Sequence, residues 1–373
     1  MATTKQTKLK TKGEDFVNQK ITEIAKGVHA SIKKSKSPEL TTPIRSLSNV
    51  TFDKKSGYFR IMDKIKTRTL TASTIKTFAQ TLRMMGLSKE LVKSEDTATK
   101  REAYYVSKNW GDARFSEQPE SDSVMDDIEA MLGVNREQMG FIPGEHGGAV
   151  AGDLVVIDQD FETKKNIKID CTQFGSGAYS IPASVEHLKF QTNAKFILAV
   201  ETQGMFERLN KHQYWKKTKC ILIAMSGVPT RACRRFIRKL SDEKKLPVYV
   251  FTDGDPYGYG NIYRTLKVGS GNAAHINEFF CVPQAVFLGV TPDDIDSYDL
   301  PTHPLKDIDF KKIKDMIKND PFIKGHKEWQ KALAKMAKSK VRVEQQAFAA
   351  YGLNYVMEKY LPDKLADKKS WLP

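Results

Sequence analysis

The sequence VFTDGDPYGYGNIYRTL, at residues 250–266, joins a short apolar run to a segment with helical spacing. The run PVYVF at residues 247–251 is rich in β-branched and aromatic residues, and Gly254 and Pro256 interrupt regular structure directly after it. Ile262 and Leu266 then follow a helical period. The pattern predicts a buried strand that ends in a loop before a helix, the place where α/β sheets bind their ligands.

Two carboxylates lie in that loop. Asp253 and Asp255 are two residues apart, and Gly254 leaves room between them for a bound ion. Carboxylates ~4 Å apart repel by ~4 kcal/mol at an effective dielectric near 20, and a divalent cation turns that repulsion into attraction. The pair therefore suits a metal ion, although a solvated Asx turn is the commoner explanation of an isolated Asp-Gly-Asp.

The composition indicates the class of partner. Sixty Lys and Arg against 45 Asp and Glu give a formal charge of +15, which suits a polyanion such as nucleic acid. The four cysteines have no zinc-site or disulfide-framework spacing, which favours a reducing, intracellular setting. No apolar run approaches the ~20 residues of a membrane span, so we expect a soluble protein without a membrane partner.

The N-terminal half is predicted to be largely helical. Residues 1–14 are polar and basic and should form a flexible tail, followed by an amphipathic helix over residues 16–33. The runs SNVTF (48–52) and GYFRI (57–61) suggest two short strands. Apolar residues from Ile75 to Met85 recur at helical spacing, and Gly86 is placed to end that helix. A second, Lys-rich helical stretch follows, and the pair resembles a winged-helix DNA-binding unit.

A tyrosine pair in this region is a second candidate for chemistry. A nucleophilic tyrosine needs a nearby cation or base, because its hydroxyl has a pKa near ~10. On a helix, Arg101 would lie beside Tyr105, where it could hold a phosphate. Judged on spacing alone, packing in the core or at its rim explains Tyr104 and Tyr105 more simply.

Beyond residue 194 the pattern becomes one of alternating strands and helices. A glycine-dense connector at residues 140–152 precedes it, and residues 154–157 and 166–171 suggest a hairpin. Continuous apolar runs at residues 195–200, 220–224, 248–251 and 285–290 alternate with helical segments, which predicts a mainly parallel sheet. Glu201 follows the first of these strands, so it should share the carboxyl edge with Asp253 and Asp255. Residues 310–360 are again predicted to be helical.

An acidic residue after one strand and D-x-D after another is the pattern of the Toprim domain. The surrounding sequences are more specific, and the likeness runs in order from about Thr71 to the C-terminus: KREAYYVSKNW (100–110), VETQGMFERL (200–209), SGVPTRACRRF (226–236), DGDPYGYGNIYRTLKVGSG (253–271) and CVPQAVFLGVTPDDI (281–295). Together they closely resemble the A subunits of archaeal type IIB DNA topoisomerases (topoisomerase VI). That family also contains the meiotic double-strand-break transesterases.

The resemblance implies a site and a chemistry. The family's nucleophile matches Tyr105, its motif arginine matches Arg101, and its Mg²⁺-binding trio matches Glu201, Asp253 and Asp255. The tyrosine would cut both strands of duplex DNA through 5′-phosphotyrosyl links. The implied partners are double-stranded DNA, a second copy of the chain and a GHKL-type ATPase B subunit in an A2B2 heterotetramer, which uses ATP to relax or decatenate DNA. This chain has no P-loop of its own. A cytoplasmic, nucleoid-associated protein is expected.

The expected fold class is α/β plus α+β. Residues 1–69 would form a basic tail, helix and short strands for partner docking. A winged-helix (CAP-like) domain would span 70–145, a Toprim domain with a mainly parallel sheet 150–310, and a helical extension 311–373. Two other functions stay open: a break-forming protein that initiates recombination, and a non-catalytic architectural DNA-binding protein. Three carboxylates at one sheet edge count against the second.

Overall fold

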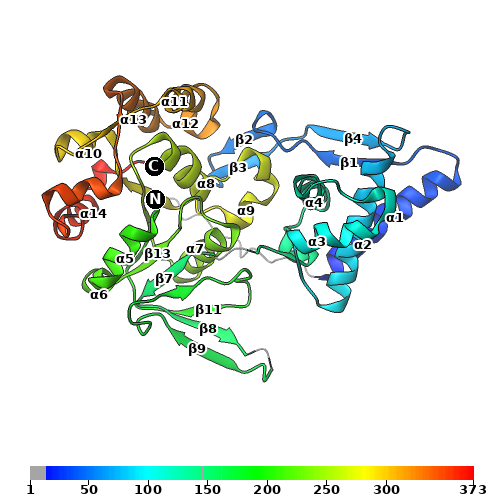
Figure 1. Ribbon diagram of the computed structural model, residues 1–373, viewed down its shortest axis with the longest axis horizontal. Coiled ribbons are helices and arrows are strands. Elements are labelled where there is room, and N and C mark those ends of the chain that lie inside the picture. Colours follow the sequence, from blue (N-terminus) through cyan, green and yellow to red (C-terminus); the bar gives the residue numbers. More distant parts are fainter. Residues whose placement is uncertain (1–13, 145–146, 161) are drawn as a thin grey trace. The chain divides into compact units, whose positions relative to one another are not determined.

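The computed structural model describes residues 14–144, 147–160 and 162–373 (Figure 1). The predicted tail at residues 1–14 lies outside these residues except for Glu14, where the first helix begins. The chain divides into two compact units, each of which is described by itself. Unit 1 comprises Met1–Val50, Arg60–Gly144 and Gly271–Phe279, and unit 2 comprises Thr51–Phe59, Glu145–Ser270 and Phe280–Pro373.

Unit 1 is built mainly from helices. Its larger elements are, in chain order, α1 (Glu14–Lys33), β1 (Glu39–Pro43), β4 (Ile65–Thr69), α2 (Ile75–Ser94), β5 (Ala98–Thr99), α3 (Lys100–Val106), α4 (Gln118–Leu132) and β6 (Phe141–Ile142). β1 pairs with β4 in antiparallel fashion, and β5 pairs with β6 in parallel. The short strands β2 (Val50–Asp53) and β3 (Tyr58–Ile61) pair with each other. The division of the chain into two units falls inside both strands, after Val50 and after Phe59. The predicted helix at residues 16–33 and the two predicted strands are therefore confirmed.

The apolar faces of the unit 1 helices meet in one core. Its members come chiefly from α1, α2 and α4, and they include Val17, Ile21, Met84, Met85, Leu91, Val124, Met125 and Ile128. The prediction that Gly86 ends the helix is wrong, because α2 continues to Ser94 and Glu95 provides the left-handed cap at φ 54°. Glycine costs a helix about 1 kcal/mol relative to alanine, and the burial of Leu91 and Val92 beyond it outweighs that cost.

Unit 2 is organised around a mixed sheet. In the described residues the strand order is β10–β7–β13–β12–β14–β15. The parallel strands are β12 (Phe196–Val200), β13 (Cys220–Ala224), β14 (Val248–Phe251) and β15 (Ala285–Gly289), which confirms the predicted mainly parallel sheet. β7 (Ala149–Gly152) and β10 (Tyr179–Ser180) extend it in antiparallel fashion. Residues 149–152, expected to form a connector, are thus a strand of the sheet.

The remaining elements of unit 2 surround this sheet. A separate antiparallel sheet has the order β11 (Lys189–Gln191), β8 (Val155–Gln159), β9 (Asn166–Asp170), which confirms the predicted hairpin. The connecting helices are α5 (Gln203–Lys211), α6 (Tyr214–Thr218), α7 (Arg231–Lys244), α8 (Arg264–Lys267), α9 (Asn277–Phe280, which begins in unit 1) and α10 (Pro292–Ser297). After them come β16 (His303–Pro304), α11 (Asp307–Asn319), α12 (Pro321–Gly325), α13 (Lys327–Ser339), β17 (Val341–Arg342) and α14 (Leu361–Ala366).

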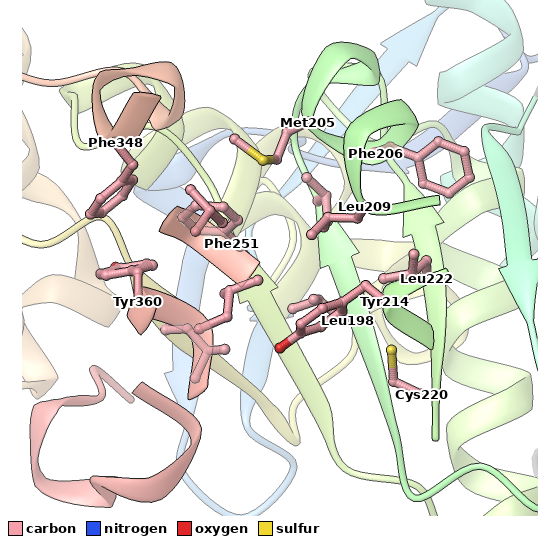
Figure 2. Packing of buried hydrophobic residues seen from close by; sticks show 14 of the residues in the cluster. Leu198, Met205, Phe206, Leu209, Tyr214, Cys220, Leu222, Phe251, Phe348 and Tyr360 are labelled. Carbon is pink, nitrogen blue, oxygen red and sulfur yellow. The ribbon is translucent and has the colours of Figure 1, made fainter. Parts of the chain in front are cut away.

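One face of the central sheet is covered by α5 and by the C-terminal segment. Figure 2 shows this packing, in which side chains of the strands meet those of α5 and of residues 348–360: Leu198, Leu222, Met205, Phe206, Leu209, Phe348 and Tyr360. The helical character predicted for residues 310–360 is present in α11 and α13. However, β17 interrupts the helices and pairs with β16. The strand ends next to the acidic loop, so this interruption bears on the site.

Within the described ranges, no helix is both long enough and apolar enough to cross a membrane.

Candidate active site

Glu201 and Asp253 come together at the carboxyl edge of the parallel sheet. β12 and β14 are adjacent, with Val200 opposite Phe251, so each strand delivers its following residues to the same edge. The amide of Asp253 donates a 2.8 Å hydrogen bond to Oε2 of Glu201. Glu201 is only 8% exposed, and burial to this degree is rare for a glutamate. Parallel pairing therefore places the residues as the sequence predicted.

Asp255 completes the acidic cluster on the loop after β14. Its Oδ1 accepts a 2.6 Å hydrogen bond from the amide of Gly258, at the start of the π-helical turn η5 (Gly258–Tyr263). Gly258 has to be glycine, because a Cβ there would lie 2.5 Å from the carbonyl oxygen of Asp253. The loop thus folds back tightly on itself, and its second carboxylate is fixed by the backbone.

Burial makes the charged forms of these carboxylates costly. Removal from water is the largest cause that raises the pKa of Glu201 to about 8, and repulsion by Asp253 is the second. Burial is also the main cause that raises the pKa of Asp253 to about 6, and it raises the pKa of Asp255. A divalent cation among them would offset both burial and repulsion.

The oxygen atoms available fit such a cation. Oε1 of Glu201 and Oδ2 of Asp253 accept no hydrogen bond from the described residues, so each has an oxygen to offer. These are hard carboxylate oxygens, the ligands that Mg²⁺ prefers. In the described part of the chain, however, no three acidic, histidine or cysteine side chains already converge on a metal-binding geometry. A bound ion would have to draw the carboxylates closer together.

Residues 341–345 support the acidic loop from outside the sheet. Gly254 and Val343 exchange backbone hydrogen bonds of 2.8 Å and 3.2 Å. The amide of Gln345 donates to Oδ1 of Asp253 at 2.8 Å, and its side-chain amide donates to the carbonyl of Phe251 at 2.9 Å. Nη1 of Arg342 lies 3.8 Å from Oδ2 of Asp255. This segment therefore holds both aspartates.

The tyrosine pair lies in unit 1, on the short helix α3. A capping box starts this helix: Oγ1 of Thr99 accepts a hydrogen bond from the amide of Glu102, and Oε2 of Glu102 accepts one from the amide of Thr99. Tyr105 is 56% exposed, and the guanidinium of Arg101 lies 6.0 Å from its ring centroid. The structure thus brings Arg101 and Tyr105 together, as the helical spacing predicted.

Tyr104 has a different environment from its neighbour. Its hydroxyl donates a 3.2 Å hydrogen bond to the carbonyl of Ser116, and the ammonium of Lys108 lies 4.1 Å from its ring centroid. These contacts anchor Tyr104 and leave Tyr105 as the more accessible of the two tyrosines. Tyr105 and the acidic cluster belong to different units.

Three family models match successive segments of the chain. The model described as "Type IIB DNA topoisomerase" matches residues 76–141, which include Arg101 and Tyr105. "All-beta domain in DNA topoisomerase VI alpha subunit" matches residues 144–194. The model of the Toprim domain shared by topoisomerase 6 A subunits and Spo11 matches residues 196–365, which include the three carboxylates.

Curated relatives match nearly the whole chain. A protein of Methanocaldococcus jannaschii, named as the A subunit of type 2 DNA topoisomerase 6, is 54% identical over 97% of this chain and 98% of its own length. Proteins of the same name from Methanothermobacter thermautotrophicus and Pyrococcus abyssi are 38% and 37% identical, over 88% and 95% of this chain and 91% and 94% of their own lengths. The chain belongs to the family of topoisomerase VI A subunits.

Membership in this family agrees with the resemblance seen in the sequence motifs. It makes the chain a member of a DNA topoisomerase family and its C-terminal half a Toprim domain, a class of domain that generally binds metal ions. Sequence reasoning missed Arg342 and Gln345, because no motif marks them. The one available signal was the apolar–polar alternation VRVEQ at residues 341–345, which suggests a strand rather than the helix we expected.

Proposed function

We propose that this chain is the catalytic A subunit of a type IIB DNA topoisomerase, in which Tyr105 cuts duplex DNA by transesterification. The observation that carries the proposal is the contrast within the tyrosine pair. Tyr104 has its hydroxyl bonded to Ser116, whereas Tyr105 is more than half exposed beside Arg101. A hydroxyl that is to attack a DNA phosphate has to be accessible, and a nearby guanidinium favours both the phosphate and the developing negative charge.

The reaction conserves the number of phosphoester bonds. Oη of Tyr105 attacks the phosphorus atom and forms a bond to the 5′-phosphate. The bond to the 3′-oxygen breaks, the tyrosine gives up its proton, and the leaving oxygen takes one to become a 3′-hydroxyl. Arg101 would hold the phosphate during this exchange. Because the bond energy is kept in the phosphotyrosyl link, the same steps in reverse reseal the strand without a nucleotide.

Glu201, Asp253 and Asp255 would hold Mg²⁺ in this proposal. The ion would neutralise phosphate charge and keep the 3′-hydroxyl in place for religation. The support is the burial of Glu201, the partial burial of Asp253 and Asp255, and the oxygens of Glu201 and Asp253 that accept no hydrogen bond from the described residues. The chain's own contribution is to hold Asp253 through Gln345 and Asp255 through Gly258, so that the ion has to order few groups.

The larger assembly follows from the same proposal. We assign residues 70–145 to a winged-helix (CAP-like) domain, 150–310 to the Toprim domain and 311–373 to a C-terminal extension. Residues 1–69 would dock a GHKL-type ATPase B subunit in an A2B2 heterotetramer. The B subunit would bind ATP and drive strand passage, so that the assembly relaxes or decatenates DNA. The protein would be cytoplasmic and associated with the nucleoid. Two copies of this chain are needed because one chain supplies a single Tyr105 and a duplex has two strands.

A break-forming role in recombination is the second candidate. The Toprim model that matches residues 196–365 covers both topoisomerase subunits and Spo11 proteins, and both classes would cut DNA by the same chemistry. Strand passage separates the two roles. With the partner ATPase and ATP, a topoisomerase relaxes supercoiled plasmid, whereas a break-forming protein leaves covalently attached, linear product.

Trapping the covalent intermediate tests the cleavage chemistry. The catalytic chain is incubated with its partner ATPase, Mg²⁺, a non-hydrolysable ATP analogue and end-labelled plasmid, and the reaction is stopped with detergent. Wild-type protein and Tyr104→Phe should both yield DNA covalently attached to protein, and Tyr105→Phe should yield none while its affinity for DNA changes less than about twofold, since basic residues supply most of the affinity. Adduct formed by Tyr105→Phe would exclude Tyr105 as the nucleophile.

A further inference from the structure

Arg342 has a fixed position beside the acidic loop. It lies on β17, which pairs with β16, and its neighbour Val343 exchanges backbone hydrogen bonds with Gly254. The approach is so close that a Cβ on Gly254 would lie 2.6 Å from a side-chain carbon of Val343. Pairing with β16 and the hydrogen bonds between Val343 and Gly254 therefore hold the backbone of Arg342 next to the Asp253-Gly254-Asp255 loop.

The guanidinium of Arg342 has unused hydrogen-bonding capacity. It carries five N–H donors, and the 3.8 Å from Nη1 to Oδ2 of Asp255 is an ion pair but too long for a hydrogen bond. Nε is buried and has no hydrogen-bond partner among the described residues. The side chain as a whole is one quarter exposed, so a ligand can reach it. A buried donor left without an acceptor is costly, and an acceptor supplied by a bound ligand is one way to offset that cost.

The ligand that fits these donors is an anion with several oxygens. A guanidinium binds phosphate through two parallel N–H···O bonds, and Nε with one Nη forms such a fork. The neighbouring carboxylates would repel a phosphate while they are charged and free of metal. A divalent cation on Asp253 and Asp255 removes that repulsion and also weakens the hold of Asp255 on Arg342.

We propose that Arg342 binds a phosphate of the DNA backbone, and that it does so only when a divalent cation occupies the acidic cluster. This inference rests on the proposed function, which supplies both the cation and the DNA. Without the cation, Arg342 serves as a counter-ion to Asp255. With the cation bound, the N–H groups of Arg342 donate hydrogen bonds to the phosphate instead. Cation and DNA then strengthen each other's binding, because coupling between two ligands is reciprocal.

The test measures DNA binding in protein that cannot cut. All variants carry Tyr105→Phe and are assembled with the partner ATPase, and binding of a fluorescent duplex is followed by anisotropy over a range of KCl concentrations. Each phosphate contact contributes about 0.9 to the slope of log K against log salt concentration. At fixed Mg²⁺, Arg342→Gln should lower the magnitude of that slope by about 0.9, and in metal-free buffer it should leave the slope unchanged. An unchanged slope in Mg²⁺ overturns the proposal.

Two further variants separate a phosphate contact from an effect of charge or folding. Lys338→Gln removes the same charge from an exposed position on α13, and it should show no Mg²⁺-dependent change of slope. Arg342→Lys keeps the charge but loses the fork, so it should retain the slope and bind DNA several-fold more weakly in Mg²⁺. Wild-type affinity in Arg342→Lys would contradict a guanidinium fork, and this variant decides the matter even if Arg342→Gln does not fold.

Calorimetric titration with Mg²⁺ in the absence of DNA distinguishes this proposal from a purely structural role. Loss of a neighbouring positive charge should tighten Mg²⁺ binding in Arg342→Gln several-fold. Weaker Mg²⁺ binding would mean that Arg342 only orients Asp255, and the proposal fails. If the parent protein itself binds no Mg²⁺, the assignment of the acidic cluster fails. If the parent binds Mg²⁺ and DNA and Arg342→Gln matches it in both, only the role of Arg342 fails.

Discussion

The backbone amide of Gln345 donates a 2.8 Å hydrogen bond to Oδ1 of Asp253, across 92 residues of sequence. The side chain of Gln345 is fully buried and makes two more contacts at the same sheet edge. Its Nε2 donates to the carbonyl of Phe251 at 2.9 Å, and its Oε1 accepts from the hydroxyl of Thr202 at 3.1 Å. One residue thus connects the ends of β12 and β14, from which Glu201 and Asp253 emerge.

Replacing Gln345 by alanine should therefore loosen the acidic site. The change removes two hydrogen bonds, one to the carbonyl of Phe251 and one from the hydroxyl of Thr202, at a cost of about 1–3 kcal/mol in the free energy of unfolding. It should also weaken Mg²⁺ binding, because the side chain that connects the strand ends next to Glu201 and Asp253 is lost, while the backbone amide of residue 345 still donates to Asp253. Thermal unfolding and calorimetry measure the two effects. Gln346→Ala is the matched control, since Gln346 is exposed, and it should change neither quantity. Equal effects in both variants would contradict this role of Gln345.

A comparison of Glu201 with Gln345 shows which parts of the site could be predicted from the sequence. Glu201 follows a buried apolar run of five residues, and parallel pairing of such strands is enough to bring it to Asp253. The placement of Arg101 beside Tyr105 likewise follows from helical spacing, whereas only the family resemblance singles out Tyr105 as the nucleophile. Gln345 and Arg342 act through a long-range contact between the segment that begins with β17 and the acidic loop; the alternation at residues 341–345 indicates a strand but does not indicate what that strand contacts. The extension of α2 past Gly86 was missed for a related reason, because tertiary burial outweighed the local preference of glycine.

The three carboxylates should act as one metal site. Asp253→Ala removes a ligand, and it should weaken Mg²⁺ binding by roughly tenfold or more and suppress DNA cleavage at limiting Mg²⁺. Asp307→Ala is a suitable control, because Asp307 is exposed in the first turn of α11 and is not part of the acidic cluster. Calorimetry and the covalent-adduct assay provide the measurements. Full cleavage by Asp253→Ala at limiting Mg²⁺ would show that Asp253 does not hold the ion.

Lys267 should give unit 2 a pH-dependent stability. It is 9% exposed, and its ammonium donates to the carbonyls of Pro283 and Ala285 at 3.0 Å and 2.7 Å. Burial lowers its pKa from 10.5 to about 8. Between these values the unfolded chain binds more protons than the folded one, so the contribution of Lys267 to stability rises as the pH increases from 8 to 10.5. The full change is about 3 kcal/mol.

The measurement compares wild type with Lys267→Met by urea unfolding from about pH 7.5 to about pH 10.5, a range that spans both pKa values. The difference in unfolding free energy should shift in favour of wild type as the pH rises, since methionine cannot titrate. Lys244→Met, at an exposed position on α7, should show a constant difference from wild type over the same range. A constant difference for Lys267→Met as well would mean that folding does not lower the pKa of Lys267.

The tyrosine and the acidic cluster belong to different units of the chain, so the assembled enzyme can combine them within one copy or between two. We predict that the cleavage site forms between the two copies of the dimer, with Tyr105 of one copy reaching the carboxylates of the other. Opening and closing of the dimer would then separate and reunite the two halves of each site. The ATPase partner would drive this motion through residues 1–69, whose helix α1 buries Val17 and Ile21 and leaves its opposite, mainly polar side exposed.

Mixed dimers decide between the two arrangements. When Tyr105→Phe chains are combined with Asp253→Ala chains, a site formed between the copies keeps one intact pairing, and plasmid nicking on a single strand should return. If each site lies within one copy, every site in this dimer carries a defect and no nicking occurs. The control places both changes in one chain, which is then combined with wild type. That dimer should be inactive if sites form between the copies, because each site then has one defective half, and it should nick DNA if they do not. Nicking by the control together with inactivity of the first mixture would therefore refute the arrangement between the two copies.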